Sequence, residues 1–373
     1  MQKIELKLND TQLLKGFGIL CIVLHNFCHW LPKCALENEY TFHLKRTFVL
    51  LDFLKNGEHI FLNLFSYFGH YGVPLFLFLS GYGLVRKYEQ QPHSPSSTAL
   101  SFIWHQACKL WHLLWPGLLL WFFSDLYLHD WHWTHTWQHV VLLVGFVGNF
   151  LVGQDIAVGP EWLRHFVNSL PKRDLLMGPW WFFSLIMQLY IVYRLLLYRR
   201  GKLPLILITT GCLALLTFSV LIHDRHQDLL CFLRYNFVGS FLPFAMGIWA
   251  ARYALYVDQK LSLLALCLFV ASCFHSVAWL FSPLLFVISC LPMVSAKGAV
   301  RLVLEEIGRL SAILFVVHPI VRAYFILYIN QGGHWYAGLF GYLLITFALA
   351  LVYRHVLTHT DRQWHRFHPT TPF

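Results

Sequence analysis

The stretch LLKGFGILCIVLHNFCHW, from Leu13 to Trp30, is long and mostly apolar, with a lysine near its start and two histidines near its end. Such a segment is tolerated in hydrocarbon because a helix satisfies its own backbone groups. An ionisable side chain inside a span is costly, so an imidazole there is a functional candidate. His25 follows Lys15 by ten residues, roughly 15 Å along a helix. The stretch therefore predicts a first spanning helix with a proton-accepting group well inside the membrane.

The composition agrees with a membrane protein along the whole chain. Of 373 residues, 57% are hydrophobic and 12% are charged, whereas about a quarter is charged in typical soluble domains. The formal net charge is +10, but the cations stand at the ends of apolar runs, as the positive-inside rule expects. We therefore predict an all-α, polytopic integral membrane protein whose partner is the lipid bilayer, and no nucleic-acid binding.

Apolar runs that are long enough to cross about 30 Å of hydrocarbon predict about ten transmembrane helices. They fall at 13–31, 72–86, 101–124, 179–198, 203–222, 232–251, 261–277, 279–296, 308–329 and 336–354. An even number and the balance of flanking cations place both termini in the cytoplasm. Residues 1–358 are expected to form one transmembrane domain, and 359–373 a polar, frayed cytoplasmic tail. The short run 140–152 is interpreted as a re-entrant or interfacial helix.

The histidines leave several alternatives open. His25 and His29 are one turn apart on one helix face, where they could ligate zinc or haem, form structural hydrogen bonds or take part in catalysis. No acidic residue lies near them in sequence, and catalysis is the favoured interpretation, with no metal. A second group (His129, His132, His135 and His139) lies in a Trp-rich segment that is interpreted as an interfacial aromatic belt.

Polar side chains in other spans add candidates. Ser80, Gly81 and Gly83 form a small-residue patch that either packs closely against a helix or leaves an opening for an acyl carrier. In the fourth span, Ser184, Gln188 and Tyr190 either bridge helices or line a cavity, because buried polar atoms need partners. His318, before Pro319, is a further intramembrane imidazole.

The pattern resembles the membrane-bound acyltransferase 3 family of bacterial envelope acyltransferases. The motifs that carry the resemblance, in family order, are KGFGILCIVLH (15–25), VPLFLFLSGYGL (73–84), GPWWFFSLIMQLY (178–190), FLPFAMGIWAAR (241–252) and IGRLSAILFVVHP (307–319). Members move an acyl group, usually acetyl, from cytoplasmic acyl-CoA to a hydroxyl of a sugar or polysaccharide. The resemblance implies a bacterial inner-membrane location, His25 as the catalytic histidine, Lys15 in place of the family's arginine, acyl-CoA as co-substrate and no bound cofactor.

Two departures from the family pattern matter. In the family, the histidine follows the arginine by eleven residues. Counted from Lys15, that position is occupied here by Asn26. At about 100° per residue, Lys15 and His25 lie about 80° apart, so either the Gly16–Gly18 segment is irregular or Lys15 does not act with His25. The family's fourth-span glutamate is replaced by Ile186, which leaves the acceptor open.

The predicted mechanism has His25 remove a proton from the acceptor hydroxyl. The predicted acyl-CoA or substrate-binding residues are Lys15, Asn26, His29, Ser80, Tyr82, Arg86, Lys87, Ser184, Gln188, Tyr190 and His318. A transporter or flippase of an envelope metabolite is the alternative, although the sequence shows no inverted repeat and almost no acidic residue within a span.

Overall fold

The structure, a computed structural model, describes residues 2–3, 5–91, 98–128, 140–150, 161, 178–222, 227–253 and 255–367. The histidine group at 129–139 and the end of the predicted 140–152 helix lie outside these residues.

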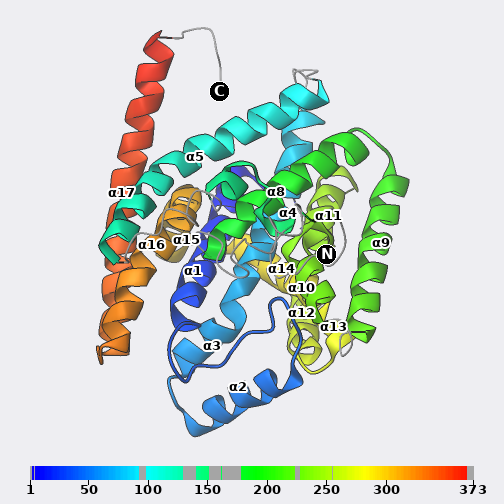
Figure 1. Cartoon of the computed structure of the whole chain (residues 1–373). Helices are drawn as coiled ribbons and strands as arrows, with labels where there is room; N and C mark the ends of the chain where they lie inside the picture. The colour runs from blue at the N-terminus through cyan, green and yellow to red at the C-terminus, as the bar shows by residue number, and fades with distance from the viewer. Residues whose placement is uncertain are drawn as a thin grey trace.

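The described chain is almost entirely helical (Figure 1). The strands in the described residues are β1 (Gln2–Lys3) and β2 (Tyr256–Val257), which form an antiparallel pair. The α-helices are α1 (Leu8–Cys28), α2 (Leu44–Asn56), α3 (Ile60–Phe68), α4 (Gly72–Tyr88), α5 (Ala99–Leu128), α8 (Trp181–Val192), α9 (Lys202–Leu221), α10 (Gln227–Tyr235), α11 (Phe237–Tyr253), α12 (Gln259–Ser272), α13 (Ser276–Trp279), α14 (Ser282–Cys290), α15 (Ala299–Arg309), α16 (Ser311–Asn330) and α17 (Trp335–Phe367). The all-α membrane fold predicted from the sequence is confirmed.

The described residues contain six helical segments that are long and apolar enough to cross a membrane, or seven if α10 and α11, bent by 41° at their junction, form one span. The predicted runs 261–277 and 279–296 become shorter helices, because α12 ends at Ser272 and α14 with its 3-10 extension ends at Ser295. The helix α5 is 30 residues long but is not among the six. The count of ten therefore stays a prediction.

Three predicted boundaries differ from the structure. The second span starts at Ile60 rather than at 72, because α3 and α4 join through a 3-10 turn at Gly69–Tyr71 into one 29-residue segment. Residues 140–150 form a short helix and a 3-10 turn at Gly148–Phe150. The helix α17 continues to Phe367, so the expected frayed tail is helical over most of its length.

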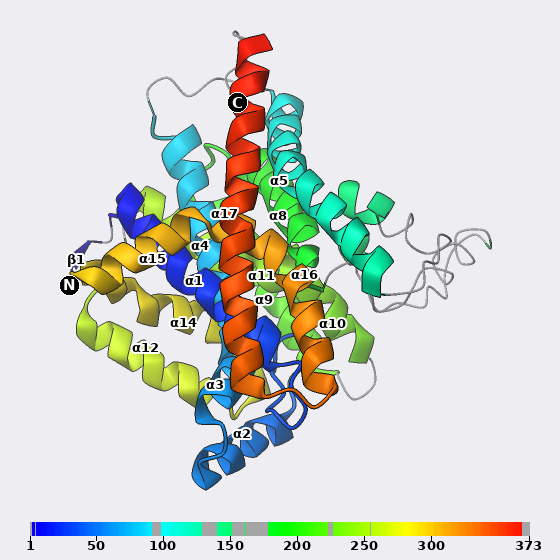
Figure 2. The same ribbon diagram turned by 90° about the vertical axis from the view of Figure 1, so that its left-hand side faces the viewer.

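The first helix lies inside the bundle, where it packs against α3, α4, α15 and α16. Of the most apolar stretch of α1, 61% is buried, against 28% for α9 and α17. Those two helices stand at opposite edges of the molecule in Figure 1, and in Figure 2 the long α17 stands upright across the near side of the molecule. The exposed apolar surfaces of α9 and α17 therefore suit contact with lipid.

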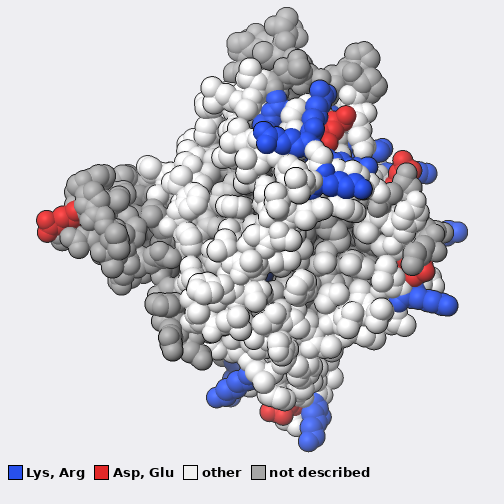
Figure 3. Space-filling view, turned by 90° about the vertical axis from the view of Figure 1, so that its right-hand side faces the viewer, with Lys and Arg blue, Asp and Glu red and all other residues white. Residues whose placement is uncertain are grey.

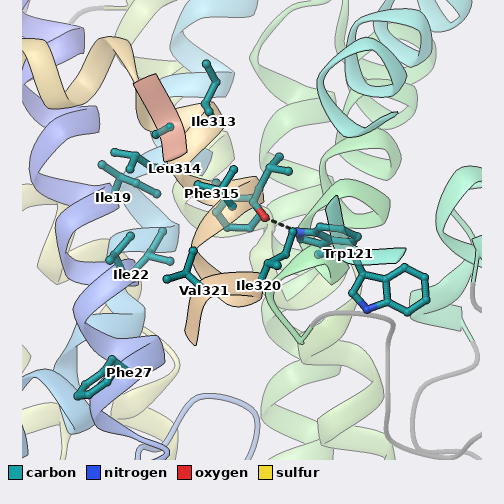
Figure 4. Close-up of a cluster of buried hydrophobic side chains, with 14 of the residues drawn as sticks. Ile19, Ile22, Phe27, Trp121, Ile313, Leu314, Phe315, Ile320 and Val321 are labelled. Carbon is teal, nitrogen blue, oxygen red and sulfur yellow. Dashed lines mark hydrogen bonds between the residues drawn. The ribbon is translucent and has the colours of Figure 1, made fainter. Parts of the chain in front are cut away.

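Burial of apolar side chains holds α1 against α16. Figure 4 shows Ile19 and Ile22 of α1 beside Leu314 and Phe315 of α16, all four within one buried cluster. In the same region the indole of Trp180 donates a hydrogen bond to the carbonyl of Val316. This packing fixes the position of the polar end of α1 relative to α16.

Charged side chains are concentrated away from the middle of the surface. Figure 3 shows Lys and Arg gathered near the upper edge of the face that α9 covers, above a wide area with few charges. At one end of α9, the cations of Arg199 and Lys202 lie 5.2 and 4.8 Å from the ring centres of Tyr198 and Tyr253. Such a band of apolar surface with cations at its edge suits a bilayer and one of its interfaces.

Candidate active site

The polar end of α1 opens into a cavity of about 140 Å³. His25, Asn26 and His29 line it, and so do residues from the loop after α1, from the α3–α4 segment and from α16. His25 is buried, with 4% of its surface exposed. Three residues that the sequence assigned to catalysis or substrate binding thus share one cavity.

The main chain of a neighbouring helix orients His25. Its Nδ1 lies 3.2 Å from the carbonyl oxygen of Phe65 in α3. A carbonyl only accepts hydrogen bonds, so Nδ1 carries the proton and Nε2 of the neutral ring keeps a lone pair. Gly69, which begins the break between α3 and α4, allows this approach, because a Cβ there would stand 2.6 Å from the Cβ of His25. His25 is therefore set up to accept a proton at Nε2.

His29 pairs with an acid that the sequence analysis did not select. Its Nδ1 lies 3.3 and 3.4 Å from the two carboxylate oxygens of Glu37. Burial alone would raise the pKa of Glu37, but the hydrogen bond and charge of His29, together with the charge of His25, hold it below its usual range. The His25 and His29 ring centres are 4.9 Å apart. Glu37 thus places a carboxylate beside His29 at the cavity that His25 lines.

His25, His29 and Glu37 also have the geometry to hold a metal ion. One ligand atom from each lies within 4.8 Å of the others, and two imidazoles with a carboxylate form a donor set that zinc accepts. The expectation that the site holds no metal stays a prediction.

Two further residues shape the cavity wall. His70 is 4% exposed, its ring centre lies 5.5 Å from that of His25, and neither of its nitrogens forms a hydrogen bond with the described residues. Glu39 lies in the loop after α1, where burial and then the negative charge of Glu37 raise its pKa to about 8. At neutral pH its carboxyl group is therefore largely protonated and can donate a hydrogen bond.

Asn26 faces a buried cation on α16. Its side-chain nitrogen donates to the carbonyl of Ile22 at 3.0 Å, and its side-chain oxygen accepts a hydrogen bond from Nη1 of Arg322, also at 3.0 Å. The Arg322 guanidinium lies 5.0 Å from the ring centre of Trp30. Asn26, which stands where the family spacing from Lys15 would place the catalytic histidine, thus holds Arg322 at the cavity.

A second cavity of about 140 Å³ lies next to the first. Ile22, Phe182 and Phe315 line both cavities and form the wall between them. Ser80 and Tyr190, both predicted site residues, line the second cavity, whose surface is mostly apolar. It lies toward the ends of α4 and α8 that carry Arg86, Lys87 and Arg194. The second cavity thus lies on the side of the His25 cavity that faces these cations.

The small-residue patch of α4 is divided between a cavity wall and a helix contact, and its predicted role as an opening for an acyl carrier stays a prediction. Ser80 lines the second cavity, whereas Gly81 packs against α11, where a Cβ would stand 2.2 Å from the carbonyl oxygen of Phe244. A Cβ on Gly83 would meet nothing within 4 Å.

Several predicted site residues lie outside both cavities and contact protein groups instead. Gln188 bridges α8 to the α10–α11 junction, because it donates to Asn236 and accepts from the backbone N–H of Phe237, each at 2.9 Å. The hydroxyl of Tyr82 accepts a hydrogen bond from the backbone N–H of Leu6. His318 uses Nδ1 to donate to the carbonyl of Leu314 in its own helix.

The remaining predicted residues also lie outside the cavity walls. Ser184 is buried and lines neither cavity. Arg86 and Lys87 are exposed at the end of α4, where Arg86 donates to Gln90. Lys15 is half-buried and lines neither cavity.

The first helix is a continuous α-helix through Gly16 and Gly18. The alternative of an irregular segment is therefore wrong, and the angular offset between Lys15 and His25 remains. Gly16 serves close packing instead, because a Cβ there would stand 1.9 Å from the carbonyl oxygen of Leu304 in α15.

Sequence reasoning missed Glu37, Glu39, His70 and Arg322. A signal existed for two of them. His70 stands three residues before the quoted motif of α4, and Arg322 follows His318 by one helical turn on α16. The acids of the loop carry no periodic pattern that would direct them to a cavity.

Comparison with known proteins supports the motif resemblance. The family model Acyl_transf_3, described as an acyltransferase domain, matches residues 9–355. Neither the curated proteins nor the solved structures that were compared with the chain gave a match. The family match covers almost the whole chain, including every residue that lines the two cavities. The chain is a multi-pass membrane protein that belongs to the acyltransferase 3 family.

Proposed function

We propose that this membrane acyltransferase moves an acyl group, acetyl in the first instance, from cytoplasmic acyl-CoA to a hydroxyl of a sugar or cell-envelope glycan, with His25 as general base. The observation that carries the proposal is the oriented imidazole of His25 in a cavity that adjoins a second, mostly apolar one. The apolar cavity suits the acyl end of the donor, and the His25 cavity, with its polar groups, suits a hydroxyl acceptor.

The reaction needs one proton acceptor near the meeting point of the two substrates. The acceptor hydroxyl passes its proton to Nε2 of His25 as its oxygen attacks the thioester carbonyl. When the tetrahedral intermediate collapses, the C–S bond breaks and the imidazolium returns the proton to the thiolate of CoA. Histidine suits both steps because it exchanges protons near neutral pH. The carboxylate of Glu37, which pairs with His29, lines the same cavity, where its negative charge favours the transient imidazolium of His25.

The donor is proposed to enter from the end of the bundle that carries Arg86 and Lys87. Exposed cations there can attract the phosphates of CoA, with lysine acting as a point charge. Lys15 lies in the first half of α1, nearer than His25 to the end of the bundle that carries Arg86 and Lys87. This position suits Lys15 for phosphate binding better than for a direct role beside the base. The proposed location is the bacterial inner membrane, with this end of the bundle in the cytoplasm.

Membrane vesicles that contain the protein and are given radiolabelled acetyl-CoA test the proposed function. Label should appear in an envelope glycan, and vesicles without the protein serve as the control. Accumulation of an envelope metabolite across the vesicle membrane without any label transfer would favour the transporter alternative.

We expect both termini to be cytoplasmic, because the cations of the predicted inner loops outweigh those of the outer ones. Reporters fused after Phe373 check this expectation: a cytoplasm-dependent reporter should be active and a periplasm-dependent one inactive. The reverse result would invert the proposed direction of donor entry.

We expect purified protein to lack stoichiometric zinc and haem, and chelators to leave its activity intact. Elemental analysis and absorption spectra measure this directly. A metal bound at one ion per chain and lost from the His25→Ala/His29→Ala double variant would show that His25 is a ligand, which would contradict its role as a base.

A further inference from the structure

Arg322 places a buried positive charge at the same cavity as His25. The side chain comes from α16, one turn beyond His318, and only 9% of the residue is exposed. A guanidinium carries five N–H donors and stays charged. Its one hydrogen bond within the described chain is the bond to Asn26, and its one ring contact there is with Trp30. Most of its donors therefore have no acceptor among the residues that the structure describes.

The acids at the cavity do not neutralise Arg322. Glu37 is paired with His29, and neither Glu37 nor Glu39 forms an ion pair with Arg322 in the described chain. Burying an unpaired charge is costly, so buried charges normally have a partner. A brace between α1 and α16 would explain the hydrogen bond to Asn26, but a neutral donor would serve it without that cost. The arrangement is typical of a site whose anionic partner is a ligand.

We propose that Arg322 binds a carboxylate or phosphate group of the acyl acceptor, so that the acceptor is an acidic or phosphorylated sugar rather than a neutral one. The proposal rests on the proposed function and specifies its acceptor. A planar guanidinium binds either anion through two parallel hydrogen bonds. The ring of Trp30 and the oxygen of Asn26 hold the group in place, and the anion would then set the distance between the acceptor hydroxyl and His25.

The position of Arg322 favours the acceptor over the donor as the source of the anion. Arg322 contacts Asn26 and Trp30, near and just beyond the end of α1 that lies away from Lys15. The exposed cations proposed to hold the CoA phosphates lie at the far end of α4, and the second cavity lies toward them. An anion at Arg322 is thus on the opposite side of His25 from the phosphates of the donor.

Ligand binding to purified protein tests this without any turnover. The probes are methyl glucuronide (a carboxylate), glucose 6-phosphate and the neutral methyl glucoside, each measured by calorimetry. A charge-assisted hydrogen bond pair should make at least one charged sugar bind about 10- to 100-fold more tightly than the neutral one. The better of the two charged probes identifies the anion. Equal binding of all three would overturn the proposal.

Arg322→Gln should abolish the preference for the charged sugar, and Arg322→Lys should keep a weaker one, because lysine retains the charge but not the fork. Arg309→Gln is the matched control, since Arg309 is exposed and pairs with Glu306 on the surface. It should leave the preference unchanged. If Arg322→Gln does not insert into the membrane, Arg322→Lys serves as the test. A lysine variant that binds the charged sugar with the same affinity and the same preference as the unmodified protein would contradict the proposal.

Kinetics separate acceptor binding from stabilisation of the reacting oxyanion. With labelled acetyl-CoA, Arg322→Gln should raise KM for the charged acceptor about 10- to 100-fold and change kcat little. An equal loss of kcat on charged and neutral acceptors would assign Arg322 to the oxyanion and overturn the proposal. Charged-sugar binding that depends on Arg322 in a protein that transfers no acyl group would instead contradict the proposed function alone.

Discussion

His25→Ala should lower the rate of acyl transfer by about 10²–10⁴-fold, the usual contribution of a general base, and leave the protein in the membrane. The substitution removes the imidazole that holds a free lone pair at the cavity, and it replaces a polar group by a methyl group within a spanning helix, which should not impair insertion. Transfer of radiolabelled acetyl in vesicles, normalised to the amount of inserted protein, measures the effect.

His29→Ala is the matched comparison, because the two rings lie 4.9 Å apart on one helix face. We expect a smaller loss of rate, since His29 is bound to Glu37 and its removal would only release that carboxylate from its position near His25. If His29→Ala loses the activity while His25→Ala keeps it, the base is His29, oriented by Glu37, and the assignment of His25 is wrong.

Gly69→Ala should cost about as much activity as a direct change in the active site. The new Cβ would stand 2.6 Å from both the carbonyl oxygen of Cys21 and the Cβ of His25, so α1 and the α3–α4 break must move apart. A displacement of about 1 Å at a reacting group can lower a rate about 100-fold. Initial rates and thermal unfolding of the purified protein together measure the effect.

Gly83→Ala provides the control for Gly69→Ala on the neighbouring helix α4. Its new Cβ would meet nothing within 4 Å, and alanine is favoured over glycine within a helix. We therefore expect unchanged or slightly higher stability and normal activity. Equal activity of the two variants would show that the approach of the α3–α4 segment does not position His25.

The sequence predicted the site best where one helix carries it. His25, Asn26 and His29 occur within five residues at the end of α1, and their shared cavity follows from local spacing. Tyr190 lines a cavity, which was one of the two alternatives predicted for it, and Ser80, predicted to pack closely or to border an opening, lines the same cavity. Gln188 shows why: whether a buried polar side chain bridges helices or faces a cavity depends on which helix lies opposite, and local sequence does not specify this.

The features that were missed depend on contacts between distant segments. Glu37 approaches His29 because the loop after α1 folds back over the cavity, and Arg322 meets Asn26 across 296 positions of sequence. The break between α3 and α4 was missed for a different reason. The run before Gly69 contains Asn63, Ser66 and Tyr67, whose polar atoms form hydrogen bonds outside their own helix. These polar residues lower the mean hydropathy of the run, so the sequence placed the start of the span too late.

The hydrogen bond that orients His25 ends on a main-chain oxygen, which every amino acid possesses. The same Phe65 oxygen also accepts the N–H of Gly69. Exchanging the phenyl ring of Phe65 for another apolar side chain therefore leaves the acceptor in place, and a survey of single substitutions would record position 65 as dispensable. The tautomer of the proposed catalytic imidazole thus depends on the path of the backbone, and a genetic screen would detect it at positions such as Gly69, where a side chain alters that path.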